Sequence, residues 1–459
     1  MTRLKVKWLC RKVSLALLLF IFLSTVLPSS AFAAGLVDIY RSAQENDPTF
    51  KDAQLQTKVI NENRKQALSL LLPKLVANAE YRQTWQDIVS SDNTVYGSGN
   101  TDFDTTSYGL TLTQPLFRWD AIVGYKQSKL MTQKAEIEYV LAQQELVVRV
   151  ATLYLNALAA QDQLVFTQAE QLAVEKHYEL ASSRQEMGLI PITDLYDARA
   201  RQATTRAATI AARDKLDDAL QALAEVTGTT VPDLKALRAE IPLLNPEPAD
   251  MNSWIDAALA QNPAITLQRQ NLEIATEEVS RQKSGHYPTL DLVGRYYDED
   301  TSGSLFGGGS EVETSEIMVQ FNLPLYQGGG IVSKVRSAKH QVSMAKQNLI
   351  KEQRSVTRNA RSAYFGVNSS LDRIEALHQS VISNQLALEA KQEGFLSGLY
   401  TSLTVLDAER DLSFVKIDYA QARYDYILNT LKLKFAVGSL QGNDLLELDQ
   451  WFVGTHANK

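Results

Sequence analysis

The side chains that could do chemistry are few in this sequence, and they do not gather into a reactive pattern. The five histidines lie far apart and show none of the spacings by which histidines share a metal ion. The glycine run at 328–330 is followed by Ile-Val-Ser-Lys, whereas a phosphate-binding loop continues with Gly-Lys-Ser or Gly-Lys-Thr. Neighbouring carboxylates such as Glu277 and Glu278 fall in charged helical stretches and are expected to be solvated. The histidines are His177, His286, His340, His378 and His456. We therefore expect no enzyme, no metal site and no cofactor.

The first 33 residues have the pattern of a secretory signal peptide. Five basic residues precede an apolar stretch at 15–26, and Ala31-Phe32-Ala33 is a small-x-small cleavage site. A transmembrane anchor is the alternative, but the apolar stretch is short for a bilayer and Pro28 follows it closely. The only cysteine, Cys10, lies inside this segment, so we expect no disulfide in the exported chain.

The rest of the chain is acidic and has no long apolar helix. Without its first 33 residues the chain loses five of 46 basic residues and none of 53 acidic ones, which leaves a net charge of −12. This excess argues against nucleic acid as a partner. After residue 33 no apolar run approaches about 18 residues, so any crossing of a membrane would require a closed β-barrel.

The exported part consists of two copies of one plan, because an ordered series of residues recurs at nearly constant spacing. Pro48, Pro73 and Tyr81 recur 215 residues later. The segment Gln114-Pro115-Leu116-Phe117 recurs as Leu323-Pro324-Leu325-Tyr326, 209 residues later. Four more pairs are 210 residues apart: Tyr154 and Tyr364, Gly188 and Gly398, Asp197 and Asp407, and Gly228 and Gly438. Such a series indicates an internal two-fold sequence repeat.

Each copy predicts the order helix, strand, loop, strand, long helix, turn and helix. The expected divisions are a signal peptide at 1–33, a first repeat at 34–228, a linker at 229–250, a second repeat at 251–437 and a C-terminal tail at 438–459. In the first repeat we expect strands near 74–85 and 105–115, a long helix at 120–187 and a helix at 191–227. In the second we expect strands near 289–298 and 314–324, a long helix at 329–396 and a helix at 402–437.

The strands alternate between apolar and polar side chains, and the long helices carry heptad spacing. The alternation fits a transmembrane barrel and equally a half-buried sheet of a soluble domain. The stretches 121–187 and 331–393 contain no proline and one glycine each, which predicts helices about 95–100 Å long. Their seam predicts coiled coils. It consists of Ile137, Leu141, Val148, Leu155, Leu158, Val165 and Leu172.

Four strands in one chain cannot close a barrel, since the smallest bacterial membrane barrels have about eight. An open edge in lipid would leave backbone groups without hydrogen bonds, so the chain would have to oligomerise. Two copies would give eight strands with a filled interior, and three copies would give twelve strands with room for a pore.

The ordered motifs resemble the TolC family of outer-membrane efflux and secretion channels along nearly all of the exported sequence. The resemblance rests on the segments 114–117, 324–329, 188–194 and 405–408, read Gln-Pro-Leu-Phe, Pro-Leu-Tyr-Gln-Gly-Gly, Gly-Leu-Ile-Pro-Ile-Thr-Asp and Val-Leu-Asp-Ala. It implies an α+β membrane protein: a homotrimer whose twelve-stranded β-barrel is continued by an α-helical coiled-coil tunnel. The implied location is the outer membrane of a Gram-negative bacterium, with a periplasmic extension. An equatorial belt would come from residues 229–250 and the tail after Gly438.

The resemblance also implies a function without chemistry. The chain would be a passive exit duct of a tripartite efflux or type I secretion system, in contact with outer-membrane lipid, an inner-membrane pump and a periplasmic adaptor. Drug efflux and protein secretion share this architecture, so the sequence does not separate them. The alternative from another class is a soluble periplasmic coiled-coil scaffold or adaptor, in which the four strands would form a small soluble sheet.

The resemblance places a closed gate at the turns 188–191 and 398–401. Asp407 matches one acidic position that narrows the family's tip, and the other acidic position is Thr404 here. Tyr400 stands where the family has a latching arginine, while Thr193 and Asp194 match the other side of that latch. We therefore expect a gate held more by packing or hydrogen bonds than by an ion pair. The alternative interpretation of Asp407 is an ordinary carboxylate in the first turn of a helix, where the helix dipole favours it.

The same turns match the family's adaptor-docking tips. The residues concerned are Gly188, Leu189, Gly398 and Leu399. A turn glycine also needs no partner to explain it, because glycine readily supplies a positive φ.

Overall fold

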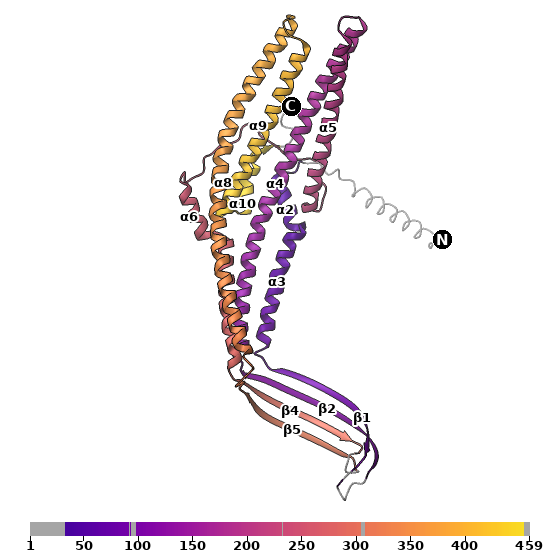
Figure 1. Ribbon diagram of the computed structural model, residues 1–459, viewed down its shortest axis with the longest axis vertical. Helices are drawn as coiled ribbons and strands as arrows, with labels where there is room; N and C mark the ends of the chain where they lie inside the picture. Colours follow the sequence, from indigo (N-terminus) through magenta and orange to yellow (C-terminus); the bar gives the residue numbers. More distant parts are fainter. Residues whose placement is uncertain (1–32, 91, 93–97, 232, 304–307, 454–459) are drawn as a thin grey trace, which may run out of the picture.

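The computed structural model is an elongated helical body with one β-sheet at its end (Figure 1). It describes residues 33–90, 92, 98–231, 233–303 and 308–453. The expected signal peptide therefore lies, except for its last residue, outside the described residues. Among the helices of the described residues, none is both long enough and apolar enough to cross a membrane.

Two very long helices form the axis of the body. α4 (Trp119–Glu186) has 68 residues and α8 (Gly330–Leu396) has 67, so each is about 100 Å long. α5 (Ile192–Thr227) returns along the upper half of α4, and α9 (Ser402–Val437) returns along α8 (Figure 1). α3 (Pro48–Ser69) and α7 (Pro263–Lys283) accompany the halves of the long helices that lead to the sheet.

A proline with a side-chain cap begins each of the helices α3 and α7. Asp47 accepts hydrogen bonds from the backbone N–H groups of Thr49 and Phe50, at 3.4 and 3.0 Å. Asn262 accepts one from Ala264 N–H at 2.8 Å. Both caps satisfy donors that a helix start leaves free, and proline at the next position needs no donor. The short helices α2 (Leu36–Asn46) and α6 (Met251–Gln261) therefore end just before these prolines.

The sheet contains four antiparallel strands in the order β1-β2-β4-β5. They are β1 (Lys74–Ile88), β2 (Gly99–Phe117), β4 (Thr289–Thr301) and β5 (Ser310–Asn322). The hairpins extend further toward their tips than the strand ranges expected from sequence, because residues such as Ile88 and Gly99 still pair across the polar loop segment. A 3₁₀ turn, η1 (Ser284–His286), leads from α7 toward β4.

The largest core lies halfway along the body, where α2, α4, α5 and α9 meet the C-terminal segment. That segment contains α10 (Gly442–Asp449) and β6 (Phe452–Val453), and β6 pairs with β3 (Ala236–Leu237). Tyr154 is completely buried here, and its hydroxyl donates to the carbonyl of Lys235 at 2.9 Å. The linker and the tail thus pack together around the middle of the long helices.

The heptad seam predicted for α4 holds only in part. Leu155 and Leu158 are buried, but the prediction is wrong at Val165 and Leu172, which are 56% and 55% exposed. Beyond Leu158 the buried positions of α4 are Ala160, Val174 and Ala181. α5 buries small side chains: Ala198, Thr205, Thr209 and Ala212. Two helices with small side chains at their contact approach closely and leave larger apolar side chains on the outside.

Replacing Tyr154 by phenylalanine tests the core around the linker. The change leaves the ring in place but leaves the buried carbonyl of Lys235 without its donor, which we expect to lower the free energy of unfolding by about 1–3 kcal/mol. Thermal unfolding followed by circular dichroism measures this. The control is Tyr364→Phe, because Tyr364 occupies the same place in the second repeat and its hydroxyl contacts the carbonyl of Ala249 at an exposed position. Equal losses in both variants would contradict the assignment.

Candidate gate at the helical tip

Both turns that were predicted from sequence lie at the end of the body remote from the sheet (Figure 1). Gly188 and Gly398 adopt φ values of 70° and 77°, in the left-handed region that favours glycine. In each turn the following leucine donates back to the helix, Leu189 to Arg184 at 2.9 Å and Leu399 to Gly394 at 2.8 Å. These are Schellman motifs, which end α4 and α8 sharply. The leucines themselves are 68% and 79% exposed.

Tyr400 packs back onto the last turn of α8 rather than reaching out to another turn. Its ring lies so close to Gly394 that a Cβ at this glycine would be 2.4 Å from Tyr400 Cδ2. Its backbone N–H also donates to the Gly394 carbonyl at 3.3 Å. Gly394 therefore makes room for the ring, a role that the sequence analysis did not assign to it.

Thr404 belongs to the cap of α9. Thr401, the residue before the helix, accepts a hydrogen bond from Thr404 N–H at 3.3 Å, and the two hydroxyls are 3.0 Å apart. The position where the family's pattern calls for a second acid is thus occupied by a neutral side chain that closes the first turn of the helix. One carboxylate, that of Asp407, remains one turn further along.

Asp407 pairs with arginines from two helices. Arg201 Nη1 of α5 donates to Asp407 Oδ1 at 2.8 Å. Arg410, which lies on α9 as Asp407 does, has its Nη1 3.7 Å from the same carboxylate oxygen. The side chains of Arg201 and Asp407 are 34% and 37% exposed, so the pair is partly shielded from water. This contact joins the helical hairpin of the first repeat to that of the second.

A second contact joins the two hairpins nearer to the turns. The hydroxyl of Ser402, at the start of α9, lies 2.5 Å from His177 Nδ1 on α4. Burial and the neighbouring arginines Arg201 and Arg184 lower the pKa of His177 from its ordinary value of 6.5. The neutral ring can accept a hydrogen bond from the Ser402 hydroxyl at Nδ1, and protonation of the ring would remove that acceptor.

Two carboxylates near these contacts are held in a less polar environment. Burial raises the pKa of Glu170 on α4, against the opposing effect of Arg410 and Arg201. Burial likewise raises the pKa of Glu409 on α9, opposed by Lys176. Glu170 and Glu409 therefore each lie near basic side chains from another helix, Glu170 near Arg201 and Arg410 and Glu409 near Lys176.

The other predicted gate residues stay within their own turn. Thr193 donates to Asp194 at 3.3 Å, and the backbone N–H of Asp194 donates to the Pro191 carbonyl at 3.2 Å. Within one chain the structure thus brings Asp407 into contact with the first hairpin, while Thr193 and Asp194 remain on its exposed surface. Arg201 and His177 were not predicted as gate residues, because an arginine among many and a histidine without ligand spacing give no signal in one sequence. Across the part of the chain that the structure describes, no cluster of three or more acidic, histidine or cysteine side chains could hold a metal ion.

Comparison with known proteins identifies the family. The family model described as "Outer membrane efflux protein" matches residues 39–229 and 254–439. The chain belongs to this family. Outer membrane protein TolC of Escherichia coli (strain K12) is 32% identical over 429 residues, covering 91% of this chain and 85% of TolC. Alkaline protease secretion protein AprF of Pseudomonas aeruginosa is 29% identical over 422 residues, covering 92% and 88%.

Solved structures share the fold. The outer membrane channel CmeC of Campylobacter jejuni superimposes with a TM-score of 0.75 at 18% identity, over 90% of this chain and 89% of that one. The outer membrane protein VceC of Vibrio cholerae gives 0.71 at 18% identity, over 88% and 96%. The resemblance inferred from the motifs is confirmed, and so are the α+β channel fold and the outer-membrane location. The protein is an outer-membrane channel subunit of the efflux and secretion class, and its relatives are transport channels rather than enzymes.

The His177 contact predicts a pH dependence of stability. Because the pKa of His177 is lower in the folded chain than its ordinary value of 6.5, the unfolded chain binds this proton more readily. The stabilisation is therefore complete above pH 6.5 and is lost as the pH falls through the lower folded-state value. Thermal unfolding across this range should show a loss in the natural protein and a smaller one in His177→Gln, which keeps an acceptor but does not titrate. Identical pH profiles would contradict the account.

Proposed function

We propose that three copies of this chain form one outer-membrane duct that is closed at its periplasmic tip. The observation that carries the proposal is the four-stranded sheet, open at β1 and β5, at the end of a helical body about 100 Å long. Three copies around a common axis supply twelve strands, which leave room for a pore, whereas two copies supply eight. The helices then continue the duct into the periplasm.

The tip acts as the gate of this duct. Asp407, Thr404 and Tyr400 of the second hairpin face the constriction, with Thr193 and Asp194 on the first hairpin of the adjacent copy. The pair between Arg201 and Asp407 and the contact between His177 and Ser402 hold the two hairpins of each copy together. Opening then requires the hairpins to separate, which breaks contacts of modest strength and leaves the cores of the helices intact.

The exposed turns form the docking site of a periplasmic adaptor that couples the duct to an inner-membrane pump. Leu189 and Leu399 present apolar side chains beyond glycines that fix the turn. Apolar side chains held on rigid turns suit insertion between the helices of a partner. The duct is passive, and the pump determines what is exported. Relatives named for protease secretion and for efflux both align with most of this chain.

Conductance across a planar lipid bilayer tests the gate. The natural protein should conduct weakly, and Arg201→Ala and Asp407→Ala should both raise the open fraction. A partly exposed ion pair worth about 0.5–1 kcal/mol shifts the balance of open and closed states by about two- to fivefold per pair. Disrupting Tyr400 should also raise conductance, because its ring fixes the second turn.

Ion selectivity, measured in the same experiment, distinguishes Asp407→Ala from Arg201→Ala. Asp407→Ala removes a negative charge from the constriction and should weaken cation preference, whereas Arg201→Ala leaves that carboxylate unpaired and should strengthen it. A natural protein that is already fully open, or two variants that change selectivity in the same direction, would contradict the proposed gate.

A further inference from the structure

The contacts between the two repeats inside one chain offer a template for contacts between chains. α4 of the first repeat packs against α7 and α9 of the second. On the outer sides of the chain, α3 and α8 have no such cover: Leu55 and Val59 are 54% and 52% exposed, and Met344 is 65% exposed. In the second repeat the counterparts of Leu55 and Val59, Gln270 and Ile274, bond to α4 through side chain and backbone. The bare face of α3 is therefore the face that α7 uses for packing.

One ion pair between the two repeats has repeat counterparts on the outer faces of α8 and α3. Lys126 of α4 lies 2.6 Å from Glu277 of α7. The repeat spacing of 210 carries Lys126 onto Arg336 of α8, and the spacing of 215 carries Glu277 onto Glu62 of α3. Both counterparts keep the charge of the residue they replace. Arg336 is exposed, and the side chain of Glu62 is 61% exposed beside Lys65.

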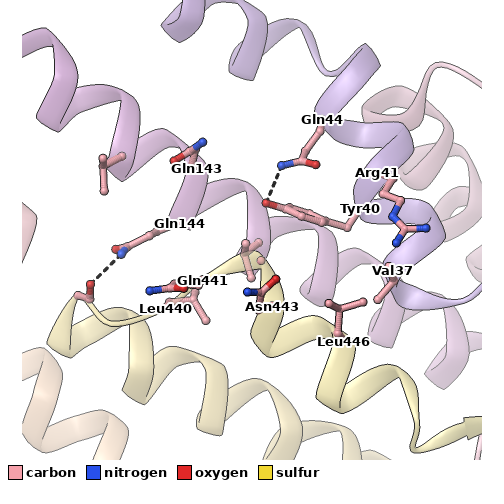
Figure 2. Close-up of a pocket in the computed structure, with 14 residues that line it drawn as sticks. Val37, Tyr40, Arg41, Gln44, Gln143, Gln144, Leu440, Gln441, Asn443 and Leu446 are labelled. Atoms are coloured by element: carbon pink, nitrogen blue, oxygen red, sulfur yellow. Dashed lines mark hydrogen bonds between the residues drawn. The ribbon is translucent and has the colours of Figure 1, made fainter.

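A hydrogen bond of the template has a matching pair as well. Gln144 Nε2 of α4 donates to the carbonyl of Gly438, at the C-terminus of α9, at 2.8 Å (Figure 2). At the repeat spacing of 210 residues, the counterpart of Gln144 is Arg354 of α8. The counterpart of Gly438 is Gly228, at the C-terminus of α5. A helix C-terminus presents free carbonyls and a partial negative charge, which a guanidinium satisfies well. Glu225, exposed in the last turn of α5, adds a full negative charge.

The α8 side of this second contact is a basic groove. A groove of about 620 Å³ between α6, α7 and α8 is lined by Arg269, Arg354, Arg358 and Arg361. None of these four, and not Arg336 either, belongs to an ion pair recorded between the described residues. Clustered arginines without acidic partners repel one another until an acidic surface covers them. On α4 the positions of Arg354, Arg358 and Arg361 are occupied by Gln144, Val148 and Ala151, which carry no charge.

We propose that α8 of one copy docks against α3 and the end of α5 of a second copy, by the same contacts that join α4 to α7 and α9 within a chain. Arg336 pairs with Glu62 of the second copy, and Arg354 binds the carbonyl end of α5 at Gly228, with Arg358 beside Glu225. The proposal rests on the shared axis of the proposed function, because rotation about an axis along the body keeps each residue at its height.

Charge exchange between the two sides tests the first contact. Glu62→Arg and Arg336→Glu each place like charges together, and we expect the SDS-resistant assembly of either variant to dissociate at a temperature several degrees lower. The double variant restores an attractive pair and should recover most of the loss. Within a chain α3 packs against α4, α4 against α7 and α7 against α8, so α3 and α8 lie at the two ends of this row and the recovery has to arise between copies. Lys65→Ala is the control, because it removes only the local partner of Glu62.

Crosslinking keeps the proposal testable if charge exchange prevents assembly. In a Cys10→Ser background, Glu62→Cys with Arg336→Cys should yield covalent dimers and trimers with a short bis-maleimide. Arg64→Cys with Arg336→Cys should not, because Arg64 is exposed and lies two residues from Glu62, about 200° around α3 on its other side. No recovery in the double variant together with equal crosslinking of both cysteine pairs would overturn the contact. A natural protein that never forms an SDS-resistant assembly would instead contradict the proposed function.

Discussion

The unpaired outer edges of β1 and β5 are the constraint on which the rest of this structure depends. Each edge of the four-stranded sheet carries backbone N–H and C=O groups without a strand partner among the described residues. In a membrane such groups cost several kcal/mol each unless another strand pairs with them. The chain therefore cannot function alone in the outer membrane, and the assembly that pairs these edges also sets the diameter of any duct. The helices follow the same order as the strands, since α3, α4, α7 and α8 pack in sequence as β1, β2, β4 and β5 do.

The internal repeat determines which parts of neighbouring copies must meet. A contact between first and second repeat occurs inside the chain, and the same kind of contact is required between the second repeat of one copy and the first repeat of the next. The two versions differ in chemistry, because α8 has Arg354, Arg358 and Arg361 at the positions where α4 has Gln144, Val148 and Ala151. At the tip the repeats differ again, since the counterparts of Arg201 and Asp407 are Asp411 and Asp197, two acids that cannot form an ion pair. A channel that must open needs weak contacts at one end and strong ones at the other, and this chain places its largest core away from its tip.

The sequence predicted features that depend on neighbouring residues, and it missed those that depend on distant ones. Asp47-Pro48 and Asn262-Pro263 indicate helix starts because cap and proline act within one turn, and the structure has helices beginning there. Gly188 and Gly398 indicate turns because only glycine enters the left-handed region freely. The partner of Asp407 lies 206 positions away, so no local pattern could reveal it. The heptad rule is wrong at Val165 and Leu172 because α5 contributes alanine and threonine, which draw the contact to a different face of α4. Tyr400 was predicted as a gate residue in place of an arginine, but its packing could not be predicted, because it depends on the absence of a side chain at Gly394.

The central claim is that the open sheet edges are closed by further copies of this chain in the outer membrane. Native mass spectrometry of protein extracted from the outer-membrane fraction in mild detergent tests it directly. The account predicts one dominant species with the mass of three chains, each lacking the expected signal peptide. A single chain recovered from the soluble periplasmic fraction, or an outer-membrane species of two chains, would contradict it.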